Sequence, residues 1–164
     1  MQHQRIEPGP GQESVWDYPR PPRLEPCQKN IQIVVSDIVI VDSKHCFRVL
    51  ETSHPPVYYF DPETIRMNLL HESQHGSFCE WKGQATYYSL KLDNQTIKNA
   101  AWCYKRPTRR FEAIAGFLAF YPSKMDECFV DGERVVSQEG DFYGGWITHD
   151  IVGPFKGGLG TRGW

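Results

Sequence analysis

The sequence predicts a mainly β protein with one or two short helices and an extended arm at each end. Short β-branched and aromatic runs recur between turn residues, which is typical of strands. A single stretch has a clear helical period. Proline and glycine gather at the ends: six of the 12 prolines lie in residues 1–30, and eight of the 14 glycines lie from residue 140 onward. The 164 residues suit one domain.

The two ends are expected to behave differently from the core. We expect residues 1–13 to be disordered, and residues 14–30 to form a proline-rich arm whose aromatic rings dock on a surface. That surface belongs either to the same domain or to another copy of the chain, which leaves a homo-oligomer through the arms as an alternative. Residues 31–140 form the core domain, and residues 141–164 a glycine and aromatic extension.

The first half of the core predicts four strands, at residues 31–35, 38–41, 47–50 and 57–60. Ser36 and Asp37 have the length of a tight hairpin loop, although neither is glycine. Asp61 and Pro62 predict the start of a helix of one or two turns, as N-cap and first helical residue.

The second half predicts two long strands, at residues 84–92 and 97–104. Residues 71–76 are polar and predict a loop. From Pro107 onward, apolar residues at helical spacing through Leu118 predict the one clear helix. Asp131-Gly132 predicts a hairpin between strands near residues 128–130 and 134–136.

Charge and hydropathy exclude several classes of partner. The net charge of −2 provides no basic field, so we expect neither nucleic acid nor an anionic membrane surface as a partner. No run reaches the roughly 20 apolar residues of a membrane span, and the first thirty residues lack the core of a signal peptide. These observations favour a cytoplasmic location.

The five cysteines predict reduced thiols rather than disulfides or a metal site. Their number is odd and no Cys-x-x-Cys pair occurs, so we expect no structural zinc and no cofactor. Cys46 and Cys103 lie in apolar runs and are expected to be buried. His71 and His75 are four residues apart, but their polar surroundings favour a solvated loop over a metal site.

The run from Phe78 to Gly83 places Cys79 three residues before Lys82. In a turn these two groups would lie close together, and the amine would stabilise the thiolate. We therefore expect Cys79 to be the most reactive thiol, with a packing role as the alternative. His54, which precedes two prolines, lies in extended backbone where it could line a cleft.

Several motifs together resemble one protein family. They lie at residues 48–59, 78–83, 100–104, 119–122 and 142–146, and the similarity extends from about Ser14 to Trp164. The chain thereby resembles the domain-of-unknown-function 427 family, as a longer member with a WDYPRPP arm and a GPFKGG tail. The resemblance implies an antiparallel domain of the β-tent kind, similar in topology to the Mss4-like group. This chain has Ser36-Asp37 where the family usually has a glycine pair, which affects only the turn.

Members of that family are sometimes labelled nucleotidyltransferase-like. Nucleotidyl transfer usually needs clustered carboxylates that hold a divalent metal. The Asp-x-Glu triplets here, at Asp61 and Asp131, are better explained as a helix cap and a hairpin corner. A phosphate-binding loop in the glycine-rich tail is likewise disfavoured, because no G-x-x-x-x-G-K-[ST] motif and no following helix are present.

The same motifs contain polar and aromatic residues that a β core does not require, and we expect them to converge on one cleft. They are Arg48, Glu51, Tyr58, Cys79, Lys82, Trp102 and Tyr104. Aromatic walls with a few polar groups are typical of small-ligand pockets, so the leading hypothesis is a domain that binds a small anionic molecule. In it, Arg48 and Lys82 meet the anion while Tyr58, Trp102 and Tyr104 pack against the remainder.

Two alternatives stay open. One is an enzyme in which Cys79 is the nucleophile, Lys82 lowers its pKa and Glu51 acts as acid or base. The other is an interaction module that uses the arm and the tail.

Overall fold

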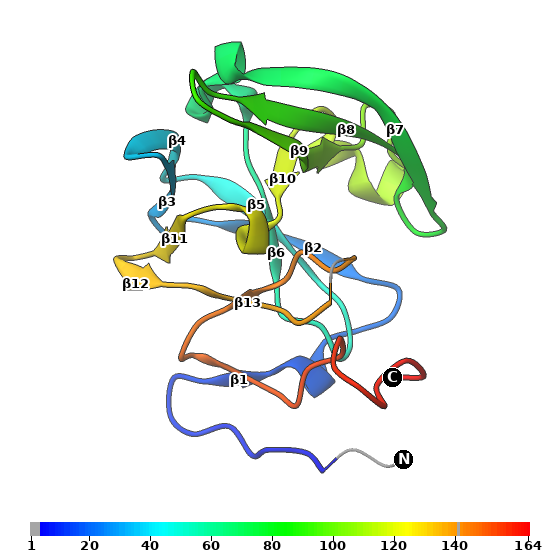
Figure 1. Ribbon diagram of the computed structural model, residues 1–164. Helices are drawn as coiled ribbons and strands as arrows, with labels where there is room; N and C mark the ends of the chain where they lie inside the picture. The colour runs from blue at the N-terminus through cyan, green and yellow to red at the C-terminus, as the bar shows by residue number, and fades with distance from the viewer. Residues whose placement is uncertain (1–3, 141) are drawn as a thin grey trace.

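A computed structural model of the chain describes residues 4–140 and 142–164 (Figure 1). Its strands are β1 (Glu13–Ser14), β2 (Arg23–Cys27), β3 (Ile31–Val35), β4 (Ile38–Ser43), β5 (Cys46–Leu50), β6 (Val57–Tyr59), β7 (Leu70–Cys79), β8 (Gly83–Lys91), β9 (Thr96–Cys103), β10 (Leu118–Phe120), β11 (Glu127–Val130), β12 (Glu133–Arg134), β13 (Val136–Ser137), β14 (Trp146–Ile147) and β15 (Ile151–Val152). The short 3-10 helices are η1 (Val15–Asp17), η2 (Pro62–Thr64), η3 (Met67–Leu69), η4 (Arg109–Ile114) and η5 (Pro122–Lys124).

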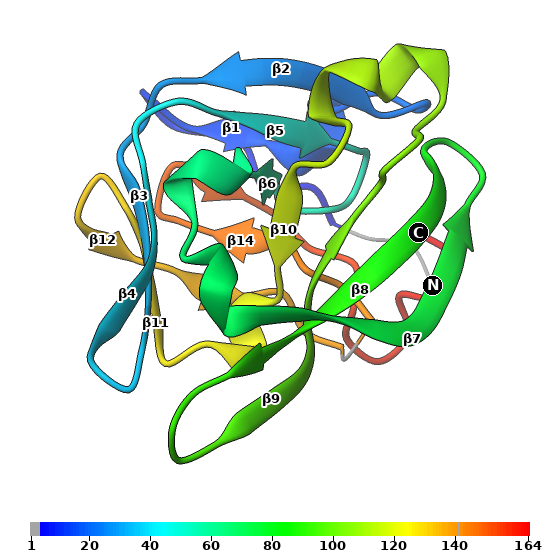
Figure 2. The same cartoon turned by 90° about the horizontal axis from the view of Figure 1, so that it is seen from above.

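Most strands pair in three antiparallel sheets, ordered β10-β9-β8-β7, β12-β11-β3-β4 and β2-β5-β6. A bridge between Phe60 and Leu118 connects the third sheet to the first. Seen from above, β2 and β5 run along one edge of the molecule and β3 and β4 along another, with β10 near the centre (Figure 2). The expected fold class, mainly β with antiparallel pairing and short helices, is confirmed.

Both predicted tight hairpins are present. Ser36 and Asp37 take left-handed φ angles of 50° and 62°, which a two-residue turn of the I′ type requires. The Ser36 N–H donates a hydrogen bond to Asp126 Oδ2 (2.8 Å), which helps to hold the turn without glycine. Asp131 and Gly132 also have positive φ, of 48° and 82°, between β11 and β12.

The polar segment at residues 71–76 is a strand, so the predicted loop is wrong. It forms most of β7, which lies at the edge of its sheet and exposes most of its side chains. Such a strand needs no apolar alternation, because neither face is deeply buried. The pairing with β8 shifts register between Glu72 and Gly76, which marks a bulge of the kind that protects sheet edges.

The predicted helix after Pro107 is shorter than its period suggested. Only η4 forms, it is a 3-10 helix, and Leu118 already lies in β10. Gly116 takes a φ of 76°, which turns the chain out of the helix. The smaller prediction at Asp61 is confirmed, since its side chain accepts a hydrogen bond from the Glu63 N–H (3.0 Å) and caps η2.

Strand β6 separates two hydrophobic cores. Because side chains alternate along a strand, Tyr58 packs into one core beside Trp146 and Tyr59 packs into the other beside Trp102. The second core is rich in aromatic residues and forms the wall of the site described below.

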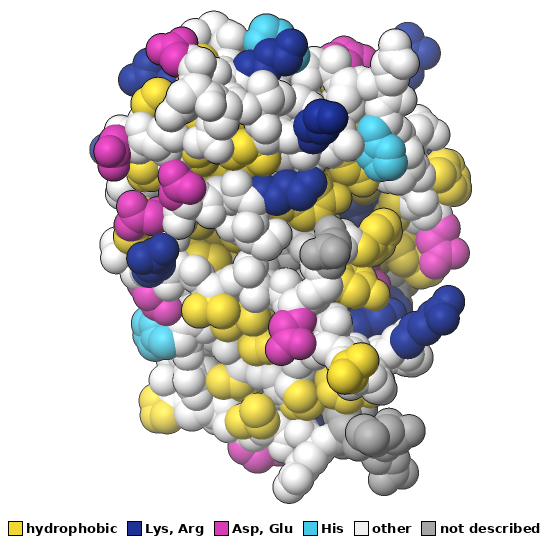
Figure 3. All heavy atoms as spheres, viewed as in Figure 1, with side chains coloured by type: hydrophobic (Ala, Val, Ile, Leu, Met, Phe, Trp, Pro, Cys, Tyr) yellow, Lys and Arg dark blue, Asp and Glu magenta, His cyan; other side chains and the backbone are white. Residues whose placement is uncertain are grey.

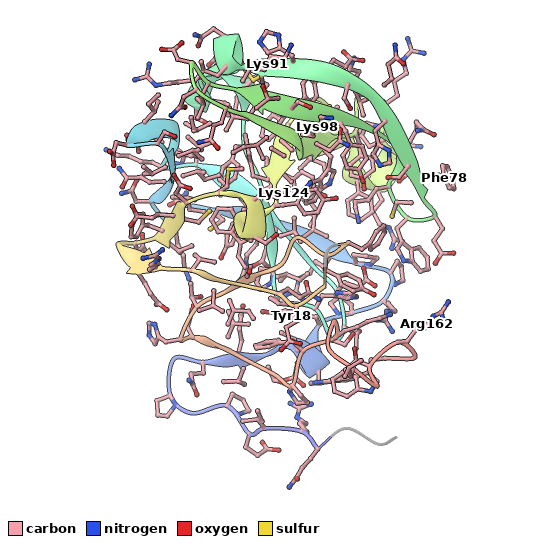
Figure 4. All side chains as sticks on the ribbon, viewed as in Figure 1. Tyr18, Phe78, Lys91, Lys98, Lys124 and Arg162 are labelled. Atoms are coloured by element: carbon pink, nitrogen blue, oxygen red, sulfur yellow. The ribbon has the colours of Figure 1, made fainter. Side chains whose placement is uncertain are left out.

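The N-terminal arm docks on the C-terminal segment of its own chain. Strand β1 pairs in parallel with β15, and the two segments run side by side at the bottom of Figure 1. Trp16 Nε1 donates to the Pro154 carbonyl (2.8 Å), and Tyr18 points inward, where it is 5% exposed (Figure 4). Glu13 lies in β1, and Gln12 contacts the His149 carbonyl, whereas residues 1–3 of the expected disordered segment lie outside the described residues.

Positive and negative side chains are interspersed on the face shown in Figure 3. Among the described residues, no helix has the length and apolar character needed to cross a membrane.

Candidate functional site

A cavity of about 560 Å³ opens among the β7–β8 hairpin, the β5–β6 pair and the C-terminal segment. Its volume falls in the range of roughly 300–1,000 Å³ that is usual for small-ligand pockets. Its lining consists of Val49, Glu51, His54, Pro55, Val57, Tyr59, Ser77, Phe78, Cys79, Glu80, Trp81, Lys82, Tyr87, Trp102, Tyr104, Tyr121, Gln138, Phe142, Tyr143, Gly144 and Lys156.

The inner wall of the cavity is aromatic. Trp102 donates from Nε1 to the Tyr59 hydroxyl (3.3 Å), and its ring centroid lies 4.5 Å from that of Tyr121. Burial raises the pKa of Tyr59, Tyr104 and Tyr121, so these phenols stay protonated at neutral pH. The wall therefore offers flat apolar faces together with neutral hydroxyl groups.

His54 is held at the edge of this wall in one tautomer. The side-chain amide nitrogen of Gln138 lies 3.1 Å from His54 Nδ1 and 2.7 Å from the Lys156 carbonyl oxygen. Gln138 Oε1 in turn accepts from the Gly145 N–H (3.2 Å). Because these backbone groups fix the amide orientation, His54 Nδ1 is an acceptor and the proton of the neutral ring lies on Nε2.

Positive charge surrounds His54. Burial lowers its pKa from 6.5 to about 4; the nearby Glu51 charge opposes this, and the charges of Lys156, Arg20 and Lys82 add to the lowering. The Glu51 carboxylate is itself paired, since its Oε2 lies 3.2 Å from Arg20 Nε and 3.7 Å from His54 Nε2. The ring is therefore neutral at pH 7 and presents an N–H donor beside several cations.

The two lysines of the lining have no acidic partner within the described part of the chain. No carboxylate of residues 4–140 and 142–164 lies within 4.0 Å of the amine of Lys82 or Lys156. Lys82 Nζ lies 5.7 Å and 5.8 Å from the ring centroids of Tyr104 and Phe111, which is cation–π distance.

Cys79 ends β7, and the turn that follows carries Lys82 into the same lining. The turn is held from outside, because the Thr108 N–H donates to the Lys82 carbonyl (3.0 Å) and its hydroxyl donates to the Trp81 carbonyl (2.7 Å). Gly83 has a φ of 110°, which lets β8 begin directly after the turn. Cys79 is only half-buried, whereas the other four cysteines are buried.

The expected convergence holds for five of the seven candidate residues: Glu51, Cys79, Lys82, Trp102 and Tyr104 line the cavity. It is wrong for Arg48 and Tyr58. These two are register partners on β5 and β6 and share the face that points away from the cavity. Their neighbours Val49 and Tyr59 take the cavity-facing positions, as the two-residue period of a strand requires.

Arg48 instead forms an ion-pair network on the other side of β5. Its guanidinium lies 2.6 Å from carboxylate oxygens of both Glu13 and Glu25, and its side chain is 14% exposed. Burial lowers the pKa of Arg48, but the two carboxylates outweigh this and raise it. The arginine therefore ties the N-terminal arm to β2 and β5 rather than meeting a ligand in the cavity.

Sequence reasoning missed several lining residues. Tyr59 was overlooked because its neighbour Tyr58 has the same side chain, and only the strand register distinguishes them. Gln138 and Lys156 come from the C-terminal part of the chain, where no periodic pattern indicates what they face. Phe78 and Phe142 also line the cavity and are each 74% exposed, and the available sequence signal was a glycine two positions away from each phenylalanine.

A separate cluster has potential metal ligands. Atoms of Glu133, His149 and Asp150 lie within 4.8 Å of one another. Each carboxylate already has partners, because Asp150 pairs with Lys29 (3.0 Å) and Glu133 accepts from the His149 backbone N–H (2.7 Å). The expectation that no structural metal is present stays a prediction.

A comparison of the sequence with models of known protein families gives a match. A family model described as a domain of unknown function, DUF427, matches residues 23–131, which is more than half of the chain. The chain belongs to this family. No curated protein matches it. In this DUF427 protein the matched region supplies the aromatic wall, Cys79 and Lys82, while Gln138, Phe142 and Lys156 come from beyond it.

Proposed function

We propose that this DUF427 protein binds a small anionic molecule with an aromatic or otherwise flat apolar part. The observation that carries the proposal is that Lys82 and Lys156, without carboxylate partners among the described residues, line an aromatic cavity of about 560 Å³. An anion would neutralise the two amines, and an aromatic ring would pack against the wall.

The hydrogen-bonding groups of the cavity support the same ligand. His54 presents its Nε2 proton, and the protonated phenols of Tyr59 and Tyr104 add hydroxyl groups. Of the two carboxylates that the described residues contribute to the lining, Glu51 is offset by Arg20, which reduces its repulsion of an anion. A cytoplasmic location, expected because the sequence has no apolar run of membrane-span length and no signal-peptide core, remains a prediction alongside this function.

Calorimetric titration with three benzene derivatives tests the proposal. Benzoate and phenyl phosphate carry the required charge, whereas benzamide is a neutral analogue of benzoate. We expect both anions to bind and benzamide to bind at least about tenfold more weakly, since hydrogen bonds to charged groups contribute about 1.5–3 kcal/mol. Equal affinity for benzoate and benzamide would contradict an anion site.

Matched lysine variants locate the binding site. Lys82→Met and Lys156→Met keep most of the apolar side chain and should each weaken benzoate binding about tenfold or more. Lys91→Met serves as the control, because Lys91 lies at the opposite end of the β7–β8 hairpin from Phe78 (Figure 4). If both cavity variants bound benzoate with the wild-type affinity, the binding site would not be in this cavity.

An enzyme remains the second candidate, because Cys79 is half-buried in the same lining as Lys82 and Glu51. In this proposal the Cys79 sulfur attacks an electrophilic carbonyl carbon, Glu51 accepts the thiol proton, and Lys82 supplies positive charge in the same lining. 4-Nitrophenyl acetate is a suitable probe: the sulfur forms a C–S bond, the C–O bond breaks, and 4-nitrophenolate leaves. A burst of product with an acetyl group on Cys79, absent in Cys79→Ser, is the expected result. Acetylation elsewhere would contradict the proposal.

A further inference from the structure

Two cysteines that are distant in sequence face each other across β2 and β5. Cys27 ends β2, Cys46 begins β5, and the two are register partners in the antiparallel pair. Register partners project to the same face of a sheet, so both thiols point into the same core. Their exposed fractions are 8% and 4%, and the cysteine spacing in the sequence gave no signal of this proximity.

The surroundings of the pair favour one thiolate beside one thiol. A hydrogen bond with Cys46 is the main cause that lowers the pKa of Cys27, whereas burial raises it. A backbone hydrogen bond from Lys29 and the positive charges of Arg48 and Lys29 lower this pKa further. The same interaction with Cys27, together with burial, raises the pKa of Cys46. Cys27 is therefore the nucleophilic member and Cys46 the protonated one.

Only one of the two cysteines lines a second cavity. This cavity, of about 310 Å³, lies on the opposite face of β5 from the aromatic one. Its lining includes Cys27, Lys29 and Arg48 but not Cys46. A solute of the size of a peroxide that enters this cavity would thus meet Cys27 first, with Cys46 beside it on the neighbouring strand.

We propose that Cys27 and Cys46 form a dithiol site that reacts with hydrogen peroxide. The Cys27 thiolate attacks one peroxide oxygen, the O–O bond breaks, and hydroxide leaves and takes up a proton to become water. Cys27 is then a sulfenic acid. The Cys46 sulfur next attacks the Cys27 sulfur, an S–S bond forms, the S–O bond breaks, and a second water leaves with the Cys46 proton. Two equivalents of an external thiol, such as dithiothreitol, reduce the disulfide by exchange.

The other cysteines lack this arrangement. Burial raises the pKa of both Cys103 and Cys128, which disfavours their thiolates. Cys79 lines the aromatic cavity and has no cysteine as a register partner. A bulky alkylating reagent and a small oxidant should therefore select different thiols in the same protein.

Peptide mapping of the full chain tests the proposal. Reduced protein is treated with one equivalent of hydrogen peroxide, and its remaining thiols are then blocked with N-ethylmaleimide in denaturant. Digestion with trypsin places Cys27 in peptide 24–29 and Cys46 in peptide 45–48. We expect these two peptides to be linked with the loss of two hydrogen atoms, and the link to disappear with dithiothreitol. Unlinked peptides alongside oxidised Cys79 would overturn the proposal.

Single variants separate the two roles. Cys46→Ser should accumulate the Cys27 sulfenic acid, which dimedone traps, whereas Cys27→Ser should consume peroxide at least about tenfold more slowly. Cys128→Ser is the control, because Cys128 is buried in the same core without a thiol partner, and it should react like the wild type. Peroxide consumption by Cys27→Ser at the wild-type rate would overturn the assignment. If a variant fails to fold, the peptide mapping of the peroxide-treated wild-type protein still tests whether Cys27 and Cys46 become linked.

Discussion

At the scale of single residues, the most informative side chain is a histidine that its surroundings keep uncharged. His54 is tied through Nδ1 to the Gln138 amide and is 16% exposed. A buried imidazole among cations binds its second proton only at low pH. The ring therefore acts as a hydrogen-bond donor in the cavity rather than as a positive charge.

This state of His54 predicts an acid-sensitive stability. The pKa of His54 is about 4 in the folded protein against 6.5 ordinarily, so folding favours the neutral ring. The corresponding stabilisation is present above pH 6.5 and is lost as the pH falls toward 4, by up to about 3 kcal/mol. Urea unfolding at several pH values should show this loss in the wild type and in His71→Gln, an exposed control, but not in His54→Gln.

A second variant distinguishes this cause from general acid unfolding. Gln138→Glu places a carboxylate beside Nδ1, so the pKa of His54 should rise and the acid-dependent loss should shrink. An unaltered pH profile in both His54→Gln and Gln138→Glu would show that His54 does not carry the effect.

Cys79 carries the second prediction at this scale. It is the half-buried thiol, whereas the other four cysteines are buried, and access to the sulfur controls alkylation. Limited treatment with iodoacetamide at neutral pH should therefore label Cys79 first, as peptide mapping would show. Prior labelling of Cys103 or Cys46 would contradict this order, because both are buried.

At the scale of elements, the two-residue period of strands decides which residues share a site. Sequence patterns located β5 and β6 correctly but could not tell which of Tyr58 and Tyr59 faces the cavity. Both are aromatic and both are about 1% exposed, because β6 lies between two cores. A strand buried on both faces has no polar side that would reveal its orientation.

The orientation of β5 predicts that Arg48 stabilises the fold without contributing to the cavity. Burial raises the pKa of Glu13, yet the hydrogen bond from Arg48 lowers it overall. Arg48→Met leaves Glu13 and Glu25 without this partner and should cost about 2–3 kcal/mol in urea unfolding. Benzoate affinity should stay unchanged.

The control for this variant is Arg23→Met, because the exposed Arg23–Glu25 pair (3.5 Å) contributes at most about 1 kcal/mol. If Arg48→Met weakened benzoate binding as much as Lys82→Met does, Arg48 would contact the ligand, contrary to this prediction.

The C-terminal segment predicts a steric effect on the cavity. A Cβ atom at Gly144 would lie 2.4 Å from Cη2 of Trp102, so the indole ring would have to move. Gly144→Ala should therefore weaken benzoate binding and cost about 1–3 kcal/mol of stability. Gly163→Ala is the matched control, since no atom lies within 4 Å of its added Cβ. Equal effects of the two substitutions would show that the C-terminal segment does not shape the cavity.

At the scale of the whole molecule, local patterns predicted the elements better than their assembly. The hairpins at Ser36 and Asp131 follow from turn residues, and β8 and β9 from β-branched and aromatic runs. Strand β7 was missed because an exposed edge carries no apolar signal. The Cys27–Cys46 pair and the contribution of Lys156 depend on contacts between distant segments, which periodicity cannot reveal.

The arm predicts how the whole molecule responds to truncation. Val15 and Tyr18 pack with Leu50 and Ile151 in a small core of their own, and Arg20 pairs with Glu51 at the cavity. Removing residues 1–22 would uncover that core and lose about 3–5 kcal/mol of apolar burial.

For a chain of this size, that loss corresponds to a decrease in Tm of about 10 °C. It would also leave the Glu51 carboxylate without Arg20 beside an anion site, so benzoate should bind more weakly. Removing only residues 1–8 deletes Arg5, whose pair with Asp17 is exposed, and should change Tm by at most a few degrees. Calorimetric melting of both truncated chains measures the difference. If the longer truncation melted like the shorter one, the arm would contribute nothing to the fold, and its aromatic residues would be free to engage another copy of the chain.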